Sequence, residues 1–417
     1  MKQYDLIVAG GGLAGVAAAV TAAREGLSVL LVEKSGCLGG ALSNNLVYPF
    51  MRYWTSDPET DERIDLSQGF FHELRDLQVR YCGTDRASHF NPEYYKFILD
   101  ELVAGAGVEV LFHAAIFKAE TAGAQLKAVY AATVAGEIRL EGRLFCDATG
   151  NGDLFYLSGC DYQLGRDADG LCQPMTTCFR MSNVDIDRFQ ADRGMLQEAY
   201  KKAKAEGAIT NPREDILTFQ GIGEGILHFN TTRVVRHDPT DPFAVSRAEM
   251  MARQQILEME AFLKAHSPAF AGSTVISISQ DIGIRESRKL RGVYILNQED
   301  LKAQRRFPDS IAAGNYDIDI HNPAGSGTSH YYFPKGAYYT IPYRSLLPKE
   351  YTNLLVAGRC ISTTHEAQAS IRIMPICACL GQAAGVAAAQ AVKSGTNTHA
   401  VDVAAVQEKL RSLGAML

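Results

Sequence analysis

Residues 4–33 read YDLIVAGGGLAGVAAAVTAAREGLSVLLVE, and their pattern is the strongest structural signal in the chain. The continuous apolar run from Tyr4 to Ala9 predicts a parallel strand that is buried on both faces. Val16 to Arg24 is rich in alanine and favours a helix, which Gly26 ends. Leu27 to Val32 is a second apolar run. These residues therefore predict a strand, a helix and a second strand parallel to the first.

The turn between the first strand and the helix carries Gly10, Gly12 and Gly15 in the spacing GxGxxG. Gly10 permits a sharp turn, Gly12 lets the backbone approach a pyrophosphate, and Gly15 lets the helix pack closely on the strand. The helix N-terminus adds free N–H groups and a positive dipole. Glu33 ends the second strand and suits the acid that binds a ribose hydroxyl. Together these features predict a dinucleotide site.

Three later segments extend this pattern. The doublet Gly39-Gly40 follows the second strand. A strand at 143–146 runs into the turn Asp147-Ala148-Thr149-Gly150. Near the C-terminus, the strand 353–357 leads into Gly358-Arg359, and an alanine-rich helix begins at Met374-Pro375, where proline suits the first helical turn.

With these segments, the chain resembles FAD-dependent oxidoreductases of the glutathione-reductase-like superfamily. It is most similar to the group that keeps an FAD domain and an inserted substrate domain, akin to fumarate reductase flavoproteins and thiazole-biosynthesis enzymes. Residues 165–180, 284–300 and 357–385 look like signatures of that group. The resemblance implies an α/β fold with a Rossmann-like, three-layer FAD-binding domain at 1–160 and 335–417. It also implies an inserted α+β, mostly β, substrate domain at 161–334.

The residues expected to hold FAD lie on these turns and at the strand end that passes the adenine in the superfamily. They are Gly10, Gly12, Leu13, Ala14, Gly15, Glu33, Lys34, Gly39, Gly40, Ala41, Ile116, Ala148, Thr149, Gly150, Gly358, Arg359 and Met374. Residues 40–47 contain neither His nor Cys, so we expect FAD to be bound non-covalently. Arg359 stands where flavin hydroxylases usually carry an Asp, which disfavours that reaction class.

The remaining chain predicts further elements. Helices are expected at Asn91 to Ala104, Asp185 to Glu206 and Ser246 to His266. A strand at 108–113 and a β-meander at 119–144 are expected between the nucleotide elements. The loop from Asn315 to Ser329 is rich in Gly, Asn and Asp, and we expect it to border the site.

Two absences narrow the reaction class. No Cys pair follows Gly40, which disfavours a disulfide reductase of this superfamily. The cluster Gly221 to Gly225 has the wrong spacing for a second, NAD(P)-binding unit and predicts a turn. The most favoured reaction is hydride transfer between a small organic substrate and FAD, with an external electron acceptor or donor. A monooxygenase that uses NAD(P)H and O2 and a flavoprotein subunit that needs a partner electron carrier are the alternatives.

Four residues are candidates for the chemistry. Arg372 lies three residues before Pro375, and in fumarate-reductase-like relatives an Arg at a similar place binds a carboxylate or moves protons; the alternative is an ion pair with Glu366. His365 is either an acid–base group or a hydrogen-bonding one. Arg285 either faces substrate or joins the domains through a salt bridge. His330 follows the Gly-rich loop and is expected to line the pocket.

The composition limits the partners. The 417 residues include 41 Lys and Arg against 47 Asp and Glu, a net charge of −6 that offers no overall basic field for nucleic acid. No apolar run reaches the length of a membrane span, and no secretory leader is apparent. The nine cysteines form no CxxC pair, so no metal site is expected and buried thiols in a reducing, cytoplasmic compartment are favoured. The oligomeric state stays open.

Overall fold

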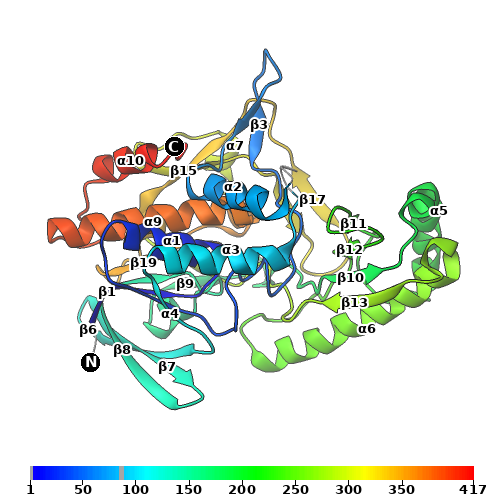
Figure 1. Cartoon of the computed structure of the whole chain (residues 1–417), viewed down its shortest axis with the longest axis horizontal. Coiled ribbons are helices and arrows are strands. Elements are labelled where there is room, and N and C mark those ends of the chain that lie inside the picture. Colours follow the sequence, from blue (N-terminus) through cyan, green and yellow to red (C-terminus); the bar gives the residue numbers. More distant parts are fainter. Residues whose placement is uncertain (1–2, 84–88) are drawn as a thin grey trace.

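The computed structural model describes residues 3–83 and 89–417. Its centre is a seven-stranded sheet (Figure 1). Five strands run parallel, in the order β5 (Glu109–Leu111), β2 (Val29–Val32), β1 (Gln3–Ala9), β8 (Gly136–Asp147) and β19 (Leu354–Val356). The first half of β8 pairs antiparallel with β7 (Gln125–Thr133), which pairs with β6 (Ala115–Ala122). The parallel core and the β-meander of the predicted α/β fold are confirmed.

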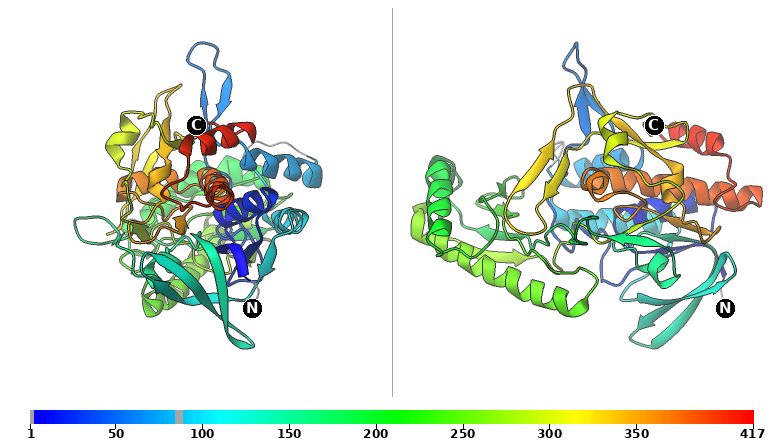
Figure 2. Two further views of the ribbon diagram at one scale, coloured as in Figure 1. Left: turned by 90° about the vertical axis from the view of Figure 1, so that its left-hand side faces the viewer. Right: turned by 180° about the vertical axis from the view of Figure 1, so that it is seen from behind.

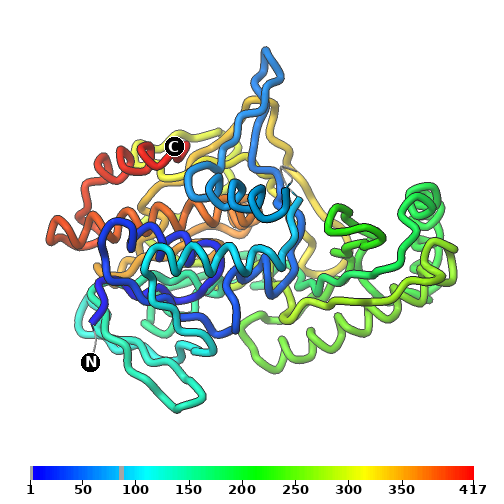
Figure 3. The backbone as a smooth tube through the Cα atoms, viewed as in Figure 1, coloured from blue at the N-terminus to red at the C-terminus, as the bar shows by residue number. Residues whose placement is uncertain are grey.

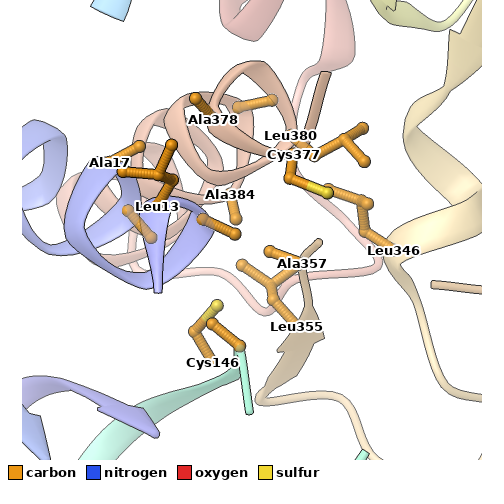
Figure 4. Packing of buried hydrophobic residues seen from close by; sticks show 14 of the residues in the cluster. Leu13, Ala17, Cys146, Leu346, Leu355, Ala357, Cys377, Ala378, Leu380 and Ala384 are labelled. Carbon is orange, nitrogen blue, oxygen red and sulfur yellow. The ribbon is translucent and has the colours of Figure 1, made fainter. Parts of the chain in front are cut away.

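Helices α1 (Leu13–Arg24) and α9 (Met374–Ser394) lie side by side against this sheet, with α3 (Pro92–Gly105) beside α1 (Figure 1). Small residues set the close packing of α1 and α9 (Figure 4). A Cβ at Gly381 would stand 2.0 Å from the carbonyl oxygen of Ala14, and one at Gly385 would stand 2.6 Å from that of Ala18. The glycines therefore let two helix backbones touch, which holds the turn before α1 in a fixed place.

Helix α9 is long and apolar enough, by length and composition, to cross a membrane. However, 83% of its most apolar 18-residue window is buried inside the structure. It is thus packed as a core helix. Helices α2 (Phe70–Cys82) and α10 (Val403–Ser412) lie on the outer side of α9 (Figure 2).

The region between α4 (Asp153–Leu157) and β14 (Arg288–Leu290) extends away from the central sheet as a cap (Figure 3). Its sheet has the order β11-β12-β10-β13, at Thr218–Phe219, Leu227–Phe229, Phe179–Ser182 and Thr274–Ile278. Two helices pack with it, α5 (Ile186–Ala205) and α6 (Pro242–His266). The turn expected at Gly221 to Gly225 joins β11 to β12.

The expectation that the inserted region is mostly β was wrong. Helices α5 and α6 have 20 and 25 residues, whereas the strands of the cap sheet have 2 to 5. Asp185 and Asp241 cap the two helices by accepting hydrogen bonds from backbone N–H groups of their first turns. Apolar residues of both helices then cover the short strands, because so small a sheet cannot bury its own face.

Residues after the cap return to the central domain. Strand β14 pairs with β9 (Tyr162–Leu164), and β15 (Ser310–Gly314) pairs with β18 (Tyr339–Pro342). The loop expected at 315–329 forms the hairpin of β16 (Ile318–His321) and β17 (Thr328–Tyr331). Buried residues from Leu290 to Phe333 belong to the core cluster of the central sheet, whereas the second cluster spans Phe179 to Phe270. The domain boundaries at 161 and 334 therefore stay a prediction. The buried apolar clusters divide the chain at other positions.

The other elements of the chain are short. The hairpin of β3 (Trp54–Ser56) and β4 (Arg63–Asp65) projects from the molecule (Figure 1). Helix α7 (Gln298–Lys302), the 3-10 helices at Pro268–Phe270 and Tyr343–Leu346, and α8 (His365–Ile371) complete the chain. Helix α8 leads directly into α9, so that its end and the start of α9 reach the region between sheet and cap.

Candidate active site

Two cavities meet between the central sheet and the cap. The nucleotide cavity, of about 250 Å³, lies along the turns after β1, β2, β8 and β19. The cap cavity, of about 500 Å³, lies between the cap sheet and the β16–β17 hairpin. Six residues line both: Ala41, Asn45, Ile284, Arg359, Arg372 and Met374. Molecules bound in the two cavities would therefore lie next to one another.

The nucleotide cavity gathers fifteen of the seventeen residues expected to hold FAD. They are Gly10, Gly12, Leu13, Ala14, Glu33, Lys34, Gly39, Gly40, Ala41, Ala148, Thr149, Gly150, Gly358, Arg359 and Met374. The exceptions are Gly15, which packs behind the cavity, and Ile116, which lies on β6 opposite Ala131. Its lining also includes five residues from the cap: Val245, Glu249, Asp281, Ile282 and Ile284.

The three motif glycines have different surroundings. Gly10 has φ +95°, and a Cβ there would stand 2.6 Å from the carbonyl oxygen of Ala148. A Cβ at Gly15 would stand 1.8 Å from the carbonyl oxygen of Gly10. A Cβ at Gly12 would meet no atom of the described chain within 4 Å. Gly10 and Gly15 thus serve the packing of the turn, whereas Gly12 faces the open cavity.

The first turn of α1 opens beside this space. Its N-cap is Gly12, which has no side chain to accept a hydrogen bond from the helix. The free N–H groups and the positive end of the helix dipole form a site for an anion such as a phosphate. The backbone N–H of Gly39 donates to the carbonyl oxygen of Gly11 at 2.8 Å, so the glycine doublet is fastened to the same turn.

Glu33 is buried and lines the nucleotide cavity. Its carboxylate accepts hydrogen bonds from the backbone N–H of Gly11 at 2.6 Å and from the N–H and hydroxyl of Ser35 at 2.8 and 2.6 Å. These bonds fix the carboxylate, and its remaining lone pairs can accept from a further donor such as a ribose hydroxyl.

The turn after β8 is shaped by Asp147. Its carboxylate accepts from the N–H and hydroxyl of Thr149 at 3.0 and 2.7 Å and from the N–H of Phe155 at 2.9 Å. Burial raises the pKa of Asp147 to about 6. The carboxylate of Asp147 thus holds the turn through hydrogen bonds to the protein itself. Thr149 and Gly150 of this turn line the cavity.

Arg359 supplies a positive charge where the cavities meet. It donates to the side-chain oxygen of Asn151 at 2.7 Å, and its Nε has no hydrogen-bond partner among the described residues. Within residues 3–83 and 89–417, no carboxylate lies at ion-pair distance from it. Burial lowers the pKa of Arg359. An anionic or electron-rich ligand group would compensate this charge, so the donor set fits a dinucleotide.

Helix α9 points its N-terminus at the same junction. Met374 and Cys377 in its first turn line the nucleotide cavity, and its N-cap, Ile373, offers no capping side chain. The dipole of a helix N-terminus lowers the pKa of a nearby thiol, but burial is the larger influence here and raises the pKa of Cys377 to about 12. Cys377 is therefore a packing residue.

In the cap cavity, Asp319 is the centre of a polar cluster. Its carboxylate lies 3.3 Å from Nε2 of His321, 3.4 Å from Nη2 of Arg372 and 3.7 Å from Nδ1 of His330, and the hydroxyl of Tyr316 donates to it at 3.1 Å. Despite its burial, these groups hold the pKa of Asp319 well below its usual range. The pKa of His321 is lowered to about 3, chiefly by burial.

The four catalytic candidates do not all reach this cavity. Arg285, His330 and Arg372 line it, but His365 lines neither cavity. Arg372 forms an ion pair with Asp319 and not with Glu366, the partner named in the ion-pair alternative, because the β16–β17 hairpin packs against α8 and brings Asp319 to the guanidinium. Among the arginines of segment 285–288, Arg288 forms the salt bridge to the central domain, with Asp153 at 3.2 Å.

His365 lies in a separate buried cluster. Its Nδ1 is 2.7 Å from the carboxylate of Glu286, which also accepts from Nζ of Lys289 at 2.5 Å and from the N–H of Gln173 at 3.0 Å. Lys289 donates further to the carbonyl oxygen of Gly165 at 2.8 Å. The cluster joins β14, α8 and the start of the cap.

Sequence reasoning did not single out several lining residues. Thr176, Arg213, Asn230, Tyr316, Asp319 and His321 line the cap cavity. The composition of 315–329 indicated the hairpin region but not which of its side chains point inward. In the described part of the chain, no group of three or more His, Cys, Asp or Glu residues could hold a metal ion.

Comparisons with known proteins found a family model that covers nearly the whole chain, and a short match to one curated protein. The family model described as FAD dependent oxidoreductase matches residues 5–410. The 3-oxosteroid 1-dehydrogenase of Mycolicibacterium smegmatis is 46% identical over 44 residues, which are 11% of this chain and 8% of that protein. This match therefore spans a small fraction of the curated relative.

Similar solved structures cover most of the chain at low identity. A geranylgeranyl bacteriochlorophyll reductase-like protein of Thermoplasma acidophilum is 14% identical, with a TM-score of 0.48, over 99% of this chain and 83% of that chain. The p-nitrophenol 4-monooxygenase PnpA of Pseudomonas putida is 10% identical, with a TM-score of 0.45, over 98% and 84%. The myxobacterial chondrochloren halogenase CndH is 14% identical, with a TM-score of 0.45, over 98% and 78%.

Proposed function

The chain belongs to the family of FAD-dependent oxidoreductases, and on this premise we propose that it transfers a hydride between a small organic substrate and non-covalently bound FAD. The substrate occupies the cap cavity, and FAD occupies the nucleotide cavity. The observation that carries this proposal is the set of six residues that line both cavities. An electron donor or acceptor outside the chain completes the cycle.

Backbone groups and two charged side chains hold FAD in this proposal. The N-terminus of α1 and the bare backbone of Gly12 receive the pyrophosphate, and Glu33 accepts a hydrogen bond from the adenine-side ribose. Arg359 and the N-terminus of α9 place positive charge at the redox end. When bound, FAD supplies the hydride chemistry.

The residues of the cap cavity orient the substrate and exchange its proton. Arg372 is held by Asp319 and presents its guanidinium at the junction of the cavities. His330 lines the same cavity, with Nδ1 3.7 Å from Asp319, and its partly exposed ring can exchange protons with solvent. The carboxylate of Asp319 orients both side chains.

An absorbance spectrum of the purified protein tests the proposal. Acid precipitation should release the flavin bands into the supernatant, and anaerobic substrate should bleach them. Flavin that stays in the pellet would contradict non-covalent binding. Oxidation of NAD(P)H without substrate would replace the proposal with a monooxygenase, and flavin that is reduced only with a partner carrier would indicate a subunit of an assembly.

A variant separates the role of His330 from that of the cofactor site. His330→Gln should slow anaerobic flavin reduction by about 100-fold, in the range by which general acid–base groups contribute. It should leave the amount of bound flavin unchanged, because His330 is outside the nucleotide cavity. An unchanged rate of reduction would remove the proton-transfer role from His330.

A further inference from the structure

The charges of the cap cavity are unevenly compensated. Its lining includes four arginines and three carboxylates. Arg213 lies 2.6 Å from Asp215, and Arg372 lies 3.4 Å from Asp319. Glu214 is 3.0 Å from Arg233, which stands behind the lining. Each of the three carboxylates is thus already paired with a guanidinium.

Arg285 has only neutral partners. Its Nη1 donates to the carbonyl oxygen of Pro174 at 2.7 Å and to the hydroxyl of Thr176, and its Nη2 makes a long contact of 3.4 Å with the side-chain oxygen of Asn230. Within the described residues, no carboxylate lies at ion-pair distance from this guanidinium, and its Nε has no hydrogen bond. The fixed Nη1 therefore leaves the Nε–Nη2 edge for a ligand.

The surroundings of Arg285 add to its need for an anion. Burial lowers the pKa of Arg285, and the positive charges of Arg372, Arg213 and Arg233 lower it further, against a smaller opposing effect of the Asp319 carboxylate. Arg359 also lacks a carboxylate, but it lines the nucleotide cavity and is assigned to FAD above. Arg285 does not line the nucleotide cavity, so its charge is available to the substrate.

The rest of the cap cavity is suited to an organic body. Val47, Met51, Leu217, Phe219 and Ile284 form apolar parts of its wall. The volume of about 500 Å³ is that of a site for a small molecule. A ligand with one anionic group and a compact apolar part would match both features.

We propose that the substrate is a small organic carboxylate, and that the Nε–Nη2 edge of Arg285, which has only the long contact with Asn230, binds its carboxylate group in the cap cavity. This inference rests on the proposed function, because it assigns the substrate class of the same site. A planar carboxylate matches the fork of an arginine edge with two parallel hydrogen bonds.

Binding of non-reacting carboxylates tests this inference. The flavin-containing protein is titrated with acetate, butyrate and benzoate, and with butyramide, benzamide and inorganic phosphate as comparisons. The readouts are the visible spectrum of bound flavin and the melting temperature, neither of which requires turnover. We expect at least one carboxylate to saturate the spectral change, and its amide to bind at least tenfold more weakly.

Two variants assign the effect to Arg285. Arg285→Met should weaken carboxylate binding at least tenfold, and Arg285→Lys should weaken it less, because charge is kept but the fork is lost. Arg188→Met, which removes an exposed arginine of α5, is the matched control and should bind as the unaltered protein does. Bound flavin should stay constant in all three, which separates this test from that of the cofactor site.

The remaining outcomes overturn the inference. Equal binding of the amide, preference for phosphate over every carboxylate, or no binding of any carboxylate would do so. Carboxylate binding that is within twofold of normal in Arg285→Met would also do so. If Arg285→Met does not fold, Arg285→Lys decides. Loss of flavin from the unaltered protein would instead contradict the proposed function, and the melting temperature would still report carboxylate binding.

Discussion

The nucleotide cavity and the cap cavity meet at six residues, yet they are built in different ways. The nucleotide cavity is walled by backbone, with glycines at the turns after four parallel strands. The cap cavity is walled by charged and apolar side chains from segments more than 300 residues apart in the chain. A backbone wall depends on the absence of side chains, whereas a side-chain wall depends on how charges are paired. Substitutions should therefore act by different mechanisms in the two cavities.

The largest effect is expected where a glycine holds backbone against backbone behind the nucleotide cavity. Gly15→Ala should destabilise the protein by at least ~3 kcal/mol, because its Cβ would stand 1.8 Å from the carbonyl oxygen of Gly10. Urea unfolding measures this loss. Gly105→Ala, at the end of α3 with no described atom within 4 Å of a Cβ, is the control and should be neutral or slightly stabilising. A stable Gly15→Ala protein would remove the contrast between backbone and side-chain walls.

The next largest effect concerns a buried charge beside the cap. Lys289→Met should cost about 3 kcal/mol, the lower end of the range for breaking a buried pair, because Glu286 keeps His365 and the N–H of Gln173. Urea unfolding of the single variants and of Lys289→Met with Glu286→Gln gives the coupling between them. The double variant should recover part of the loss. Equal, additive costs would show that the ion pair does not act as a unit.

A smaller effect separates ligand binding from folding within one motif. Gly12→Ala should leave the urea midpoint of the apoprotein nearly unchanged, because its Cβ meets no described atom within 4 Å. The methyl group would occupy space left for the pyrophosphate and should weaken FAD binding by ~2 kcal/mol, or about 30-fold. Fluorescence titration of the apoprotein with FAD measures this. FAD binding that is undiminished would contradict the role of Gly12.

The effect that is smallest at neutral pH is a change in the pH dependence of stability, which distinguishes the two halves. Burial lowers the pKa of His228, in the cap sheet, from 6.5 to about 3, so between these values only the unfolded chain binds its proton and stability falls as pH falls. Asp147, beneath the nucleotide cavity, has its pKa raised from 3.8 to about 6 and acts in the opposite direction, so its contribution rises as pH falls.

His228→Phe should reduce the acid loss by up to ~1.4 kcal/mol per pH unit between pH 6.5 and 3. The ring can be replaced because neither of its nitrogens has a hydrogen-bond partner among the described residues. Urea unfolding at several pH values in this window gives the slopes of the two proteins. Parallel slopes would show that His228 is not the source of the acid loss.

The same contrast explains what the sequence could predict. The turns after β1, β2, β8 and β19 were predicted because each consists of consecutive residues whose glycines have a steric reason to be there. The sequence did not predict Asp319, Arg213 and Asn230 as site residues, because they come together only through the packing of the hairpin and the cap sheet. Ile116 was expected near the adenine because the superfamily makes that contact after the corresponding strand, and in the structure it lies on β6, in the meander. The sequence predicted the long helices of the cap, but it did not predict that they contain more residues than its short strands.

The five residues that the cap region contributes to the nucleotide cavity have a further consequence. Val245 and Glu249 lie on α6, and Asp281, Ile282 and Ile284 follow β13, so the wall of this cavity is completed by both halves of the molecule. A dinucleotide bound there would contact both halves of the molecule at once. We therefore expect bound FAD to stabilise the contact between the two halves, and the melting temperature should rise with the concentration of FAD.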